Sequence, residues 1–195
     1  MRSDELIIGL VGPSGVGKGF AKQALVGKYG SIFHEPTVAT TRPKRSSDGA
    51  DRRAGLSKVE FGLMVATGKV AFAHQPFKNG DWYGFMSDSL IVSDKPTLTE
   101  VHVDNIQPFR QHFADSLLLI GIVATESYLR QNLAKRGSET EEQAEERLRA
   151  AITEIYGIRN YHADSIVNHL VEVGEESAHT FSGAIIGIVN QYLNL

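Results

Sequence analysis

The sequence contains no cysteine among its 195 residues. Disulfide bonds, zinc sites built on thiolates and cysteine nucleophiles are therefore excluded. The seven histidines show no His-x-x-x-His or similar ligand spacing, so a histidine-based zinc site is not indicated either. No apolar stretch reaches the ~18 residues that a membrane span needs. Acidic Asp4 and Glu5 precede the first apolar run, which is untypical of a signal peptide. We therefore expect a cytoplasmic protein without a membrane contact.

A large excess of positive charge is also missing. Lys and Arg number 20 against 23 Asp and Glu, which gives a formal charge of -3 and a pI of about 6.2. This balance argues against a general nucleic-acid binder. The hydrophobic fraction is 42%, which suits one compact domain with a sizeable core.

The strongest motif lies near the N-terminus, in LIIGLVGPSGVGKGF. Its first residues form an apolar run, 6–11, that is typical of a strand buried on both faces. The spacing Gly12-x-x-x-x-Gly17-Lys18 follows, and the pattern then predicts a helix over 18–29 that Gly30 closes. Strand, glycine loop and helix in this order predict a P-loop, whose backbone N–H groups hold the phosphates of ATP. The predicted ATP contacts are Gly12, Pro13, Ser14, Gly15, Val16, Gly17, Lys18, Gly19 and Phe20.

The loop lacks the hydroxyl that usually faces magnesium, because Gly19 and Phe20 stand where Ser or Thr is expected. Carboxylates can instead hold Mg²⁺ through water, together with the phosphates. Glu100 and Asp104 are the local candidates, since they should alternate on one strand face with His102 between them. We expect a water-mediated metal contact there.

The rest of the chain alternates strand and helix patterns, which predicts an α/β fold with a parallel sheet flanked by helices. We expect strands over 97–103, 117–124 and 165–168, and helices over 105–112, 126–136, from 138 onward and over 178–195. The polar, basic stretch after residue 36 predicts an inserted lobe, which includes a helix at 59–67 and a strand at 70–73. The predicted division is a core of 1–35, 93–125 and 156–195, an acceptor-binding lobe of 36–92 and a helical lid of 126–155.

Arginines stand where phosphoryl transfer would need cations to surround the moving phosphate. Arg42 and Arg45 share one loop, Arg136 ends one predicted helix, and Arg147 lies on the next. Closure of the lid helices would bring the last two over a bound nucleotide. With Lys18, the predicted catalytic residues are Arg42, Arg136 and Arg147.

The motifs GPSGVGKG, TTRPKR, WYG, KRGSETEEQAEERL and IVN, in this order, resemble the guanylate kinase family from about residue 7 to 168. The resemblance implies a P-loop core, a nucleoside-monophosphate lobe and a mobile lid, with ATP and Mg²⁺ as cofactors. It implies that Arg42, Arg45 and Tyr83 hold the acceptor phosphate and that Arg136 and Arg147 contact the transferring phosphate. It also implies that Asn168 lies beside the adenine of ATP.

The chain departs from that family where guanine is read. At the places of two hydroxyls and two carboxylates it has Val38, approximately Phe72, Phe85 and approximately His102. Pairing of a base's polar edge discriminates by ~10⁴ or more, so a GMP site of the usual form is not expected. Arg53 falls near the family's phosphate-binding Tyr, with Arg52 beside it. The predicted acceptor contacts are Arg42, Arg45, Arg53, Phe72, Tyr83 and His102.

Three functions remain open on the sequence. The first is transfer of the γ-phosphoryl group of ATP to a nucleoside monophosphate that need not be GMP. The second is a ribose bisphosphate phosphokinase-like sugar-phosphate kinase, which the chain resembles in AGLSKVEF and in a His, here His74, before NGDWYG. The third is a catalytically inactive guanylate-kinase-like interaction module. A small phosphorylated acceptor is the expected partner, and the chain is expected to act as a monomer or homodimer.

Overall fold

The computed structural model describes residues 5–46, 48–49, 51–77, 80–91, 94–134 and 141–193. Its main sheet has four parallel strands in the order β6-β1-β7-β8. Their bounds are Thr97–Val101 for β6, Ile7–Val11 for β1, Leu117–Ala124 for β7 and His169–Val173 for β8. Every residue of β1 and β7 is buried, because helices cover both faces of a parallel sheet.

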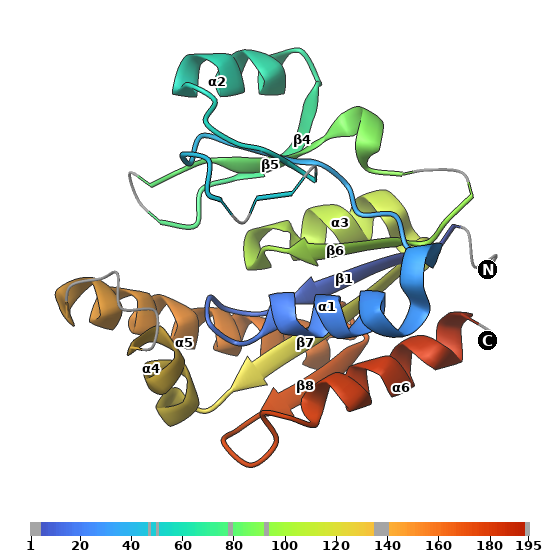
Figure 1. Cartoon of the computed structure of the whole chain (residues 1–195), viewed down its shortest axis with the longest axis vertical. Helices are drawn as coiled ribbons and strands as arrows, with labels where there is room; N and C mark the ends of the chain where they lie inside the picture. The colour runs from blue at the N-terminus through green and yellow to red at the C-terminus, as the bar shows by residue number, and fades with distance from the viewer. Residues whose placement is uncertain are drawn as a thin grey trace.

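Helices cover both faces of the main sheet (Figure 1). Helices α1, Lys18–Tyr29, and α6, Phe181–Leu193, pack against each other on one face, while α3, Ile106–Phe113, and α5, Glu141–Ala163, pack on the other. Helix α3 buries Ile106, Phe109 and Phe113, a spacing of three and then four residues that forms one apolar stripe. The predicted α/β fold with a parallel sheet and flanking helices is confirmed.

A second, smaller sheet lies on one side of the main sheet (Figure 1). Its order is β3-β2-β5-β4, from Arg52–Arg53, Val38–Thr40, Tyr83–Met86 and Val70–His74. Helix α2, Lys58–Ala66, begins at a capping box formed by Ser57 and Glu60, which satisfies the first free N–H groups of the helix. All of these elements fall inside the stretch 36–92.

The remaining helix, α4, Glu126–Ala134, packs against α5 and follows β7 after one residue. Helix α5 continues past the predicted lid boundary to Ala163, so its second half belongs to the layer that covers β7 and β8. The helix start predicted at Ser138 lies outside the described residues. Among the described residues, none of the helices is long and apolar enough to cross a lipid bilayer.

Two predicted strands are corrected by the structure. The strand expected over 165–168 is a turn, in which Ser165 has a φ of 60°, and the strand begins only at His169. The strand expected over 97–103 ends at Val101, and η4, Val103–Asn105, follows as a 3-10 turn. Asp104 therefore lies beyond the strand and does not alternate along it with Glu100.

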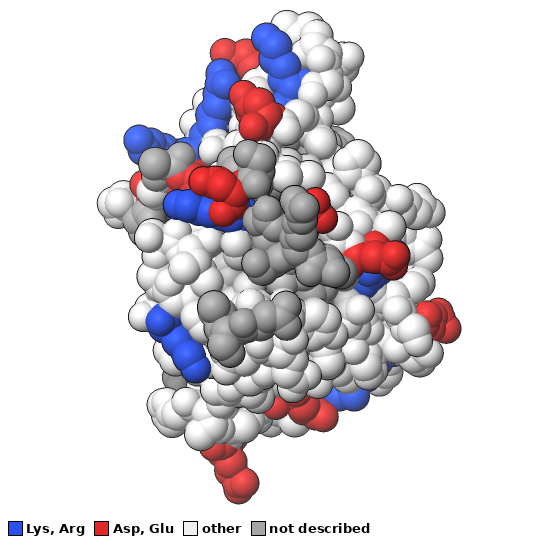
Figure 2. All heavy atoms as spheres, turned by 90° about the vertical axis from the view of Figure 1, so that its right-hand side faces the viewer, with Lys and Arg blue, Asp and Glu red and all other residues white. Residues whose placement is uncertain are grey.

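Figure 2 shows the face at the amino ends of the main-sheet strands. On this face the visible Lys and Arg side chains are interspersed with Asp and Glu, above all over the smaller sheet at the top. Such mixing of both signs agrees with the near balance of charge in the sequence. This face therefore offers no continuous basic surface among its described residues.

Candidate active site

The P-loop connects β1 to α1, as the motif predicts. Gly15 and Gly17 have φ angles of 87° and 105°, a region that favours glycine. At Gly12 an added Cβ would lie 2.6 Å from the carbonyl oxygen of Ile122, so the loop passes too close to β7 for any side chain. The loop and the N-terminus of α1 together offer the backbone N–H cradle that binds phosphate.

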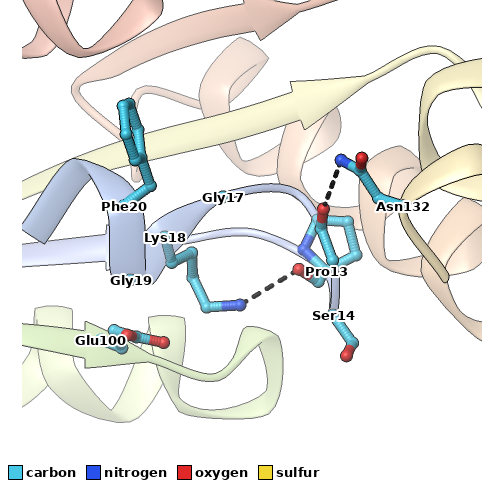
Figure 3. A pocket seen from close by; sticks show the side chains of 9 residues that line it. Pro13, Ser14, Gly17, Lys18, Gly19, Phe20, Glu100 and Asn132 are labelled. Carbon is cyan, nitrogen blue, oxygen red and sulfur yellow. Dashed lines mark hydrogen bonds between the residues drawn. The ribbon is translucent and has the colours of Figure 1, made fainter. Parts of the chain in front are cut away.

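Lys18 starts helix α1 and its side chain folds back over the loop. Its Nζ donates hydrogen bonds to the carbonyl oxygens of Gly12 at 2.6 Å and Pro13 at 3.1 Å, the latter drawn in Figure 3. A cavity of about 500 Å³ borders the loop. It is lined by Pro13, Ser14, Gly15, Gly17, Lys18, Gly19, Phe20, Glu100 and Asn132. The ammonium group is thus held at the edge of a cavity large enough for a nucleotide phosphate chain.

Phe20 takes part in the site in a different way from Lys18. Its ring is 51% exposed and lies 5.7 Å from the ring of Phe181 in α6. Figure 3 shows the two side chains of Lys18 and Phe20 pointing in different directions from the start of α1. Phe20 therefore supplies an apolar wall at the place where many P-loops have a hydroxyl.

Asn132 is a site residue that the sequence did not reveal. It lies on α4, and its Nδ2 donates a hydrogen bond of 3.1 Å to the carbonyl oxygen of Gly15 (Figure 3). This contact joins the predicted lid to the P-loop. Only its position on the inner side of a predicted helix could have suggested it, since an asparagine has no motif of its own here.

The two predicted metal-facing carboxylates have different surroundings. Glu100 lines the cavity, and its Oε1 lies 3.8 Å from the place a Cβ of Gly19 would occupy. The Asp104 side chain is 64% exposed and lies 3.3 Å from Nδ1 of His102. Among the described residues, no group of three His, Asp or Glu side chains could ligate a metal directly. The residues present fit a magnesium ion held mainly by phosphate oxygens and water, with Glu100 beside them.

Arg42 lies in the smaller lobe, where it is buried and paired. Its Nη2 lies 2.7 Å from Oδ1 of Asp48, with side-chain exposures of 9% and 6%. The other carboxylate oxygen of Asp48 accepts from the backbone N–H of Arg45 at 2.7 Å, and Arg52 Nε lies 3.7 Å from Oδ1. The hydrogen bond from Arg42 is the main cause that lowers the pKa of Asp48. Asp48, which the sequence did not single out, thus neutralises part of the predicted acceptor-phosphate cluster.

Arg45 and Arg53 are exposed. Arg53 lies in β3. Hydrogen bonds from Ser57 are the main cause that lowers the pKa of Glu60, and the Arg53 charge adds a smaller contribution. Both side chains are accessible to a ligand, and their predicted contacts with the acceptor remain predictions.

Three rings stack where the lobe meets the core. The ring centroids of His74 and His102 are 4.6 Å apart and those of His74 and Tyr83 are 5.9 Å apart, with interplanar angles of 19° and 24°. Burial lowers the pKa of His74, and it lowers the pKa of His102 to about 4 with further contributions from His74 and Lys18. Both imidazoles are therefore neutral at physiological pH.

Phe72, predicted beside the acceptor, packs elsewhere. Its ring lies 4.3 Å from that of Phe109 and 5.8 Å from that of Phe113, so it joins the core under α3. A register shift in β4 and a φ of 52° at Phe72 turn this side chain inward. His74, two residues on, takes the place beside Tyr83 and His102.

Glu154 is a third residue, after Asn132 and Asp48, that the sequence did not indicate. It lies on α5, and burial raises its pKa to about 7, an effect that the Lys18 charge opposes and the Asp104 charge reinforces. The two charges that affect the pKa of Glu154 are thus those of the P-loop lysine and of Asp104 in η4. Nothing in the local sequence distinguishes it from the exposed glutamates earlier in the same helix.

Of the predicted lid arginines, Arg147 is described and Arg136 lies outside the described residues. The guanidinium of Arg147 lies over the ring of Phe77, 5.2 Å from its centroid. Phe77 belongs to the loop between β4 and β5, so α5 reaches the smaller lobe at this point.

Asn168 lies just before β8 and does not face the loop. Its Oδ1 accepts hydrogen bonds from the backbone N–H of Leu119 at 2.8 Å and from Arg110 at 2.6 Å. The P-loop follows the carboxyl end of β1, whereas Asn168 precedes the amino end of β8. This placement does not support the predicted contact with adenine, because the side-chain oxygen already accepts two hydrogen bonds from Leu119 and Arg110.

Known structures resemble this arrangement over nearly the whole chain. The crystal structure of guanylate kinase from Anaplasma phagocytophilum matches with a TM-score of 0.67 and 18% identity, covering 98% of this chain and 87% of that one. Shikimate kinase from Acinetobacter baumannii in complex with shikimate matches with a TM-score of 0.52 and 15% identity, covering 96% and 95%. At these identities both show the fold alone. With the phosphate loop after β1, they define the class as a P-loop kinase fold.

The sequence comparisons narrow the class. Residues 4–178 match the family model described as guanylate kinase. A guanylate kinase from Prochlorococcus marinus is 26% identical over 175 residues, covering 88% of this chain and 94% of that protein. One from Bacillus subtilis is 30% identical over 160 residues, covering 80% and 77%. The chain belongs to the guanylate kinase family.

Proposed function

We propose that this chain transfers the γ-phosphoryl group of ATP to a small phosphorylated acceptor, in the first place a nucleoside monophosphate other than GMP. The observation that carries the proposal is the P-loop with Lys18 at the edge of a cavity of about 500 Å³. The match to the family model supports the same chemistry. The site requires no protein nucleophile, because the acceptor phosphate itself attacks in line.

In the proposed mechanism the chain positions two phosphates and neutralises their charge. The glycine loop and Lys18 hold the donor phosphates. Arg42 and Arg45 bind the acceptor phosphate, and Arg147, together with Arg136 as predicted from sequence, stabilises the transferring group. Bound magnesium would supply further neutralisation of the phosphate oxygens, with Glu100 beside it through water. Closure of α4 and the first half of α5 over the site would exclude water and so limit ATP hydrolysis.

The pocket chemistry argues against GMP as the preferred acceptor. Val38 and Phe85, at two of the family's guanine-reading places, face each other across β2 and β5. Phe85 is 3% exposed and its ring lies 5.5 Å from that of Phe109. These apolar side chains leave the polar edge of guanine unpaired, which is costly in a buried site.

The test is an assay of ADP release with Mg-ATP and a panel of acceptors: GMP, dGMP, AMP, the pyrimidine monophosphates and ribose bisphosphate. Acceptor-dependent turnover with any member, lost in Lys18→Ala, would support phosphotransfer. Efficient turnover with GMP would overturn the acceptor argument. Binding of ATP without turnover, or no binding of ATP at all, would favour the inactive interaction module.

A sugar-phosphate kinase is the second candidate, and one observation favours it. The side chain that stacks on Tyr83 is His74, at the place where the sequence resembles ribose bisphosphate phosphokinases. An acceptor with a second phosphate would also suit the exposed Arg45 and Arg53. Higher turnover with ribose bisphosphate than with every nucleotide in the panel would select this candidate.

A further inference from the structure

The stacked pair of His74 and His102 carries an inference about the acceptor, which rests on the proposed function. The pair bridges two parts of the molecule, since His74 ends β4 in the smaller lobe and His102 follows β6 in the core. The ring of Tyr83 also stacks with that of His74. The Lys18 charge lowers the pKa of His102, so the pair lies within electrostatic reach of the donor site.

The hydrogen bonds of His102 define which ring nitrogen carries its proton. The backbone N–H of Asp104 points at Nδ1 with a distance of 3.3 Å. A backbone N–H can only donate, so Nδ1 accepts and the proton of the neutral ring is on Nε2. The Asp104 carboxylate also lies 3.3 Å from Nδ1, but it is 64% exposed and can turn to water.

His74 has the same tautomer. The amide Nδ2 of Asn105 donates to the carbonyl oxygen of Phe72 at 2.8 Å and lies 3.0 Å from Nδ1 of His74. The carbonyl of Phe72 is also 3.2 Å from this Nδ1. The Asn105 amide has two hydrogens, so it can donate to both the Phe72 carbonyl and Nδ1 of His74, and both distances are shorter than the 3.2 Å between that carbonyl and Nδ1. Nδ1 of His74 therefore accepts a hydrogen bond, and its Nε2 carries the proton.

Both Nε2–H groups lack a partner. Among the described residues, the Nε2 of His102 is the fully buried side-chain atom without a hydrogen bond. The hydrogen bonds of His74 are made at Nδ1, and its Nε2, which is not among the fully buried unpaired atoms, has none. A buried N–H without a partner costs free energy, which a bound oxygen atom would recover. Two donors on stacked rings, whose centroids lie 4.6 Å apart, suit two neighbouring oxygen atoms.

We propose that His74 and His102 select the acceptor by donating hydrogen bonds from both Nε2 atoms to two neighbouring oxygens of its non-reacting part. This donor pair is repelled by the N1–H and amino edge of guanine and by the amino group of adenine. Two groups of phosphorylated acceptors offer the required oxygens. Sugar phosphates offer hydroxyl or phosphate oxygens, and uracil or thymine nucleotides offer ring carbonyls.

Binding to the full-length protein with a non-hydrolysable ATP analogue tests this proposal. GMP, AMP, UMP, dTMP, ribose 5-phosphate and ribose bisphosphate are titrated by calorimetry. At least one oxygen-presenting acceptor should bind at least about tenfold more tightly than GMP and AMP, a factor within the range of such pairing. Comparison of the pyrimidine nucleotides with the sugar phosphates shows whether ring carbonyls or sugar-phosphate oxygens accept the two hydrogen bonds. Preference for a purine, or no binding of any oxygen-presenting acceptor, would overturn the proposal.

Three variants and one spectroscopic measurement test the two donors separately. His102→Phe and His74→Phe keep an aromatic ring in the stack but remove the N–H donor. Each should weaken binding of the preferred acceptor about tenfold, while the affinity for ATP stays unchanged. His102→Gln, which returns an N–H at the ε position, should restore part of the loss. Long-range ¹H–¹⁵N NMR of the ring nitrogens should show the Nε2–H tautomer for both residues. An Nδ1–H tautomer at either ring would refute the proposal even if a variant fails to fold.

The outcome for this proposal is separable from that for the proposed function. If the chain phosphorylates GMP and both Phe variants keep the acceptor affinity, the proposed phosphotransfer would stand. The proposal that the histidine pair recognises the acceptor would be wrong. Loss of ADP release for every acceptor would instead count against phosphotransfer itself, and the binding series would still decide the role of the pair.

Discussion

The guanidinium of Arg147 lies 5.2 Å from the ring centroid of Phe77, so helix α5 contacts the β4–β5 loop of the smaller lobe. Two hydrogen bonds shape this loop, from Gln75 Nε2 to the carbonyl oxygen of Gly80 at 2.7 Å and from the N–H of Gly80 to the carbonyl oxygen of Phe77 at 2.9 Å. The ring thereby holds a predicted catalytic cation close to the acceptor lobe.

Removal of this ring should affect turnover more than binding. A cation–π contact at such a site contributes about 0.5–1 kcal/mol, so Phe77→Ala should lower kcat about two- to fivefold with little change in KM for ATP. Phe77→Tyr, which keeps the aromatic face, should retain most of the activity. Steady-state kinetics of both variants check this, and equal loss in the two would argue against the contact.

Lys18→Ala should reduce acceptor-dependent ADP release by at least about 100-fold, because a preorganised cation is lost from the phosphate site. The melting temperature should change little, since Nζ contacts carbonyl oxygens of its own loop. Lys28→Ala is the matched control, because Lys28 is exposed in the last turn of the same helix. Near-normal turnover in Lys18→Ala would remove the P-loop from the mechanism.

Gly12→Ala should weaken ATP binding by at least about tenfold, because the loop must move to relieve a contact with backbone and the cradle loses its shape. The new Cβ would lie 2.6 Å from the Ile122 carbonyl oxygen and 2.7 Å from Val16. Gly27→Ala provides the opposite control, since nothing lies within 4 Å of its Cβ position in α1. That variant should gain about 0.5–1 kcal/mol of stability. Calorimetric ATP titrations and thermal melts separate the two effects.

Arg42 should contribute to stability as well as to acceptor binding. Its removal leaves the buried Asp48 carboxylate without its main partner, so Arg42→Ala should lower the melting temperature by more than about 5 °C. Arg45→Ala should leave it nearly unchanged, because Arg45 contacts Asp48 through its backbone N–H, which the substitution retains. Both variants should raise the KM for the acceptor. Equal melting temperatures for the two would contradict this assignment.

The same ion pair predicts a pH dependence of stability. Because Arg42 lowers the folded-state pKa of Asp48, the pair stabilises the fold above the unfolded value of 3.8 and this contribution is lost as the pH falls through the lower folded value. Asp48→Asn should therefore be less stable than the parent chain at pH 7, with a gap that closes in acid below about pH 3.8. Denaturant melts across this range test it, with the exposed Asp88→Asn as control. A gap that persists unchanged into acid would contradict the assignment.

Local patterns in the chain were sufficient to predict the fold and the position of the glycine loop between β1 and α1. The apolar run of 117–124 and the helix of 18–29 occur at the predicted residues, because continuous burial and helix spacing are written in consecutive residues. The P-loop glycines follow from the backbone geometry that phosphate binding requires. The family motifs, which occur in the expected order, supported both the predicted fold and the predicted P-loop.

The acceptor half depended on contacts between distant segments. The ring stack joins residues 74, 83 and 102, and the Asn132–Gly15 contact spans 117 positions. Phe72 turned into the core because a single register shift in β4 reverses which side chain faces the site. Asn168 was misplaced because the strand began after it, at His169.

The sequence by itself determined a P-loop, a parallel α/β core and a lobe without the usual guanine readers, since each follows from residue type at a fixed local spacing. Tertiary structure alone decided the surroundings of the predicted site residues. The stacked neutral histidines, the buried Arg42–Asp48 pair and the raised pKa of Glu154 all arise from burial and proximity. Burial changes the charge and hydrogen-bonding needs of a side chain, and no linear pattern encodes which distant groups come to share one site.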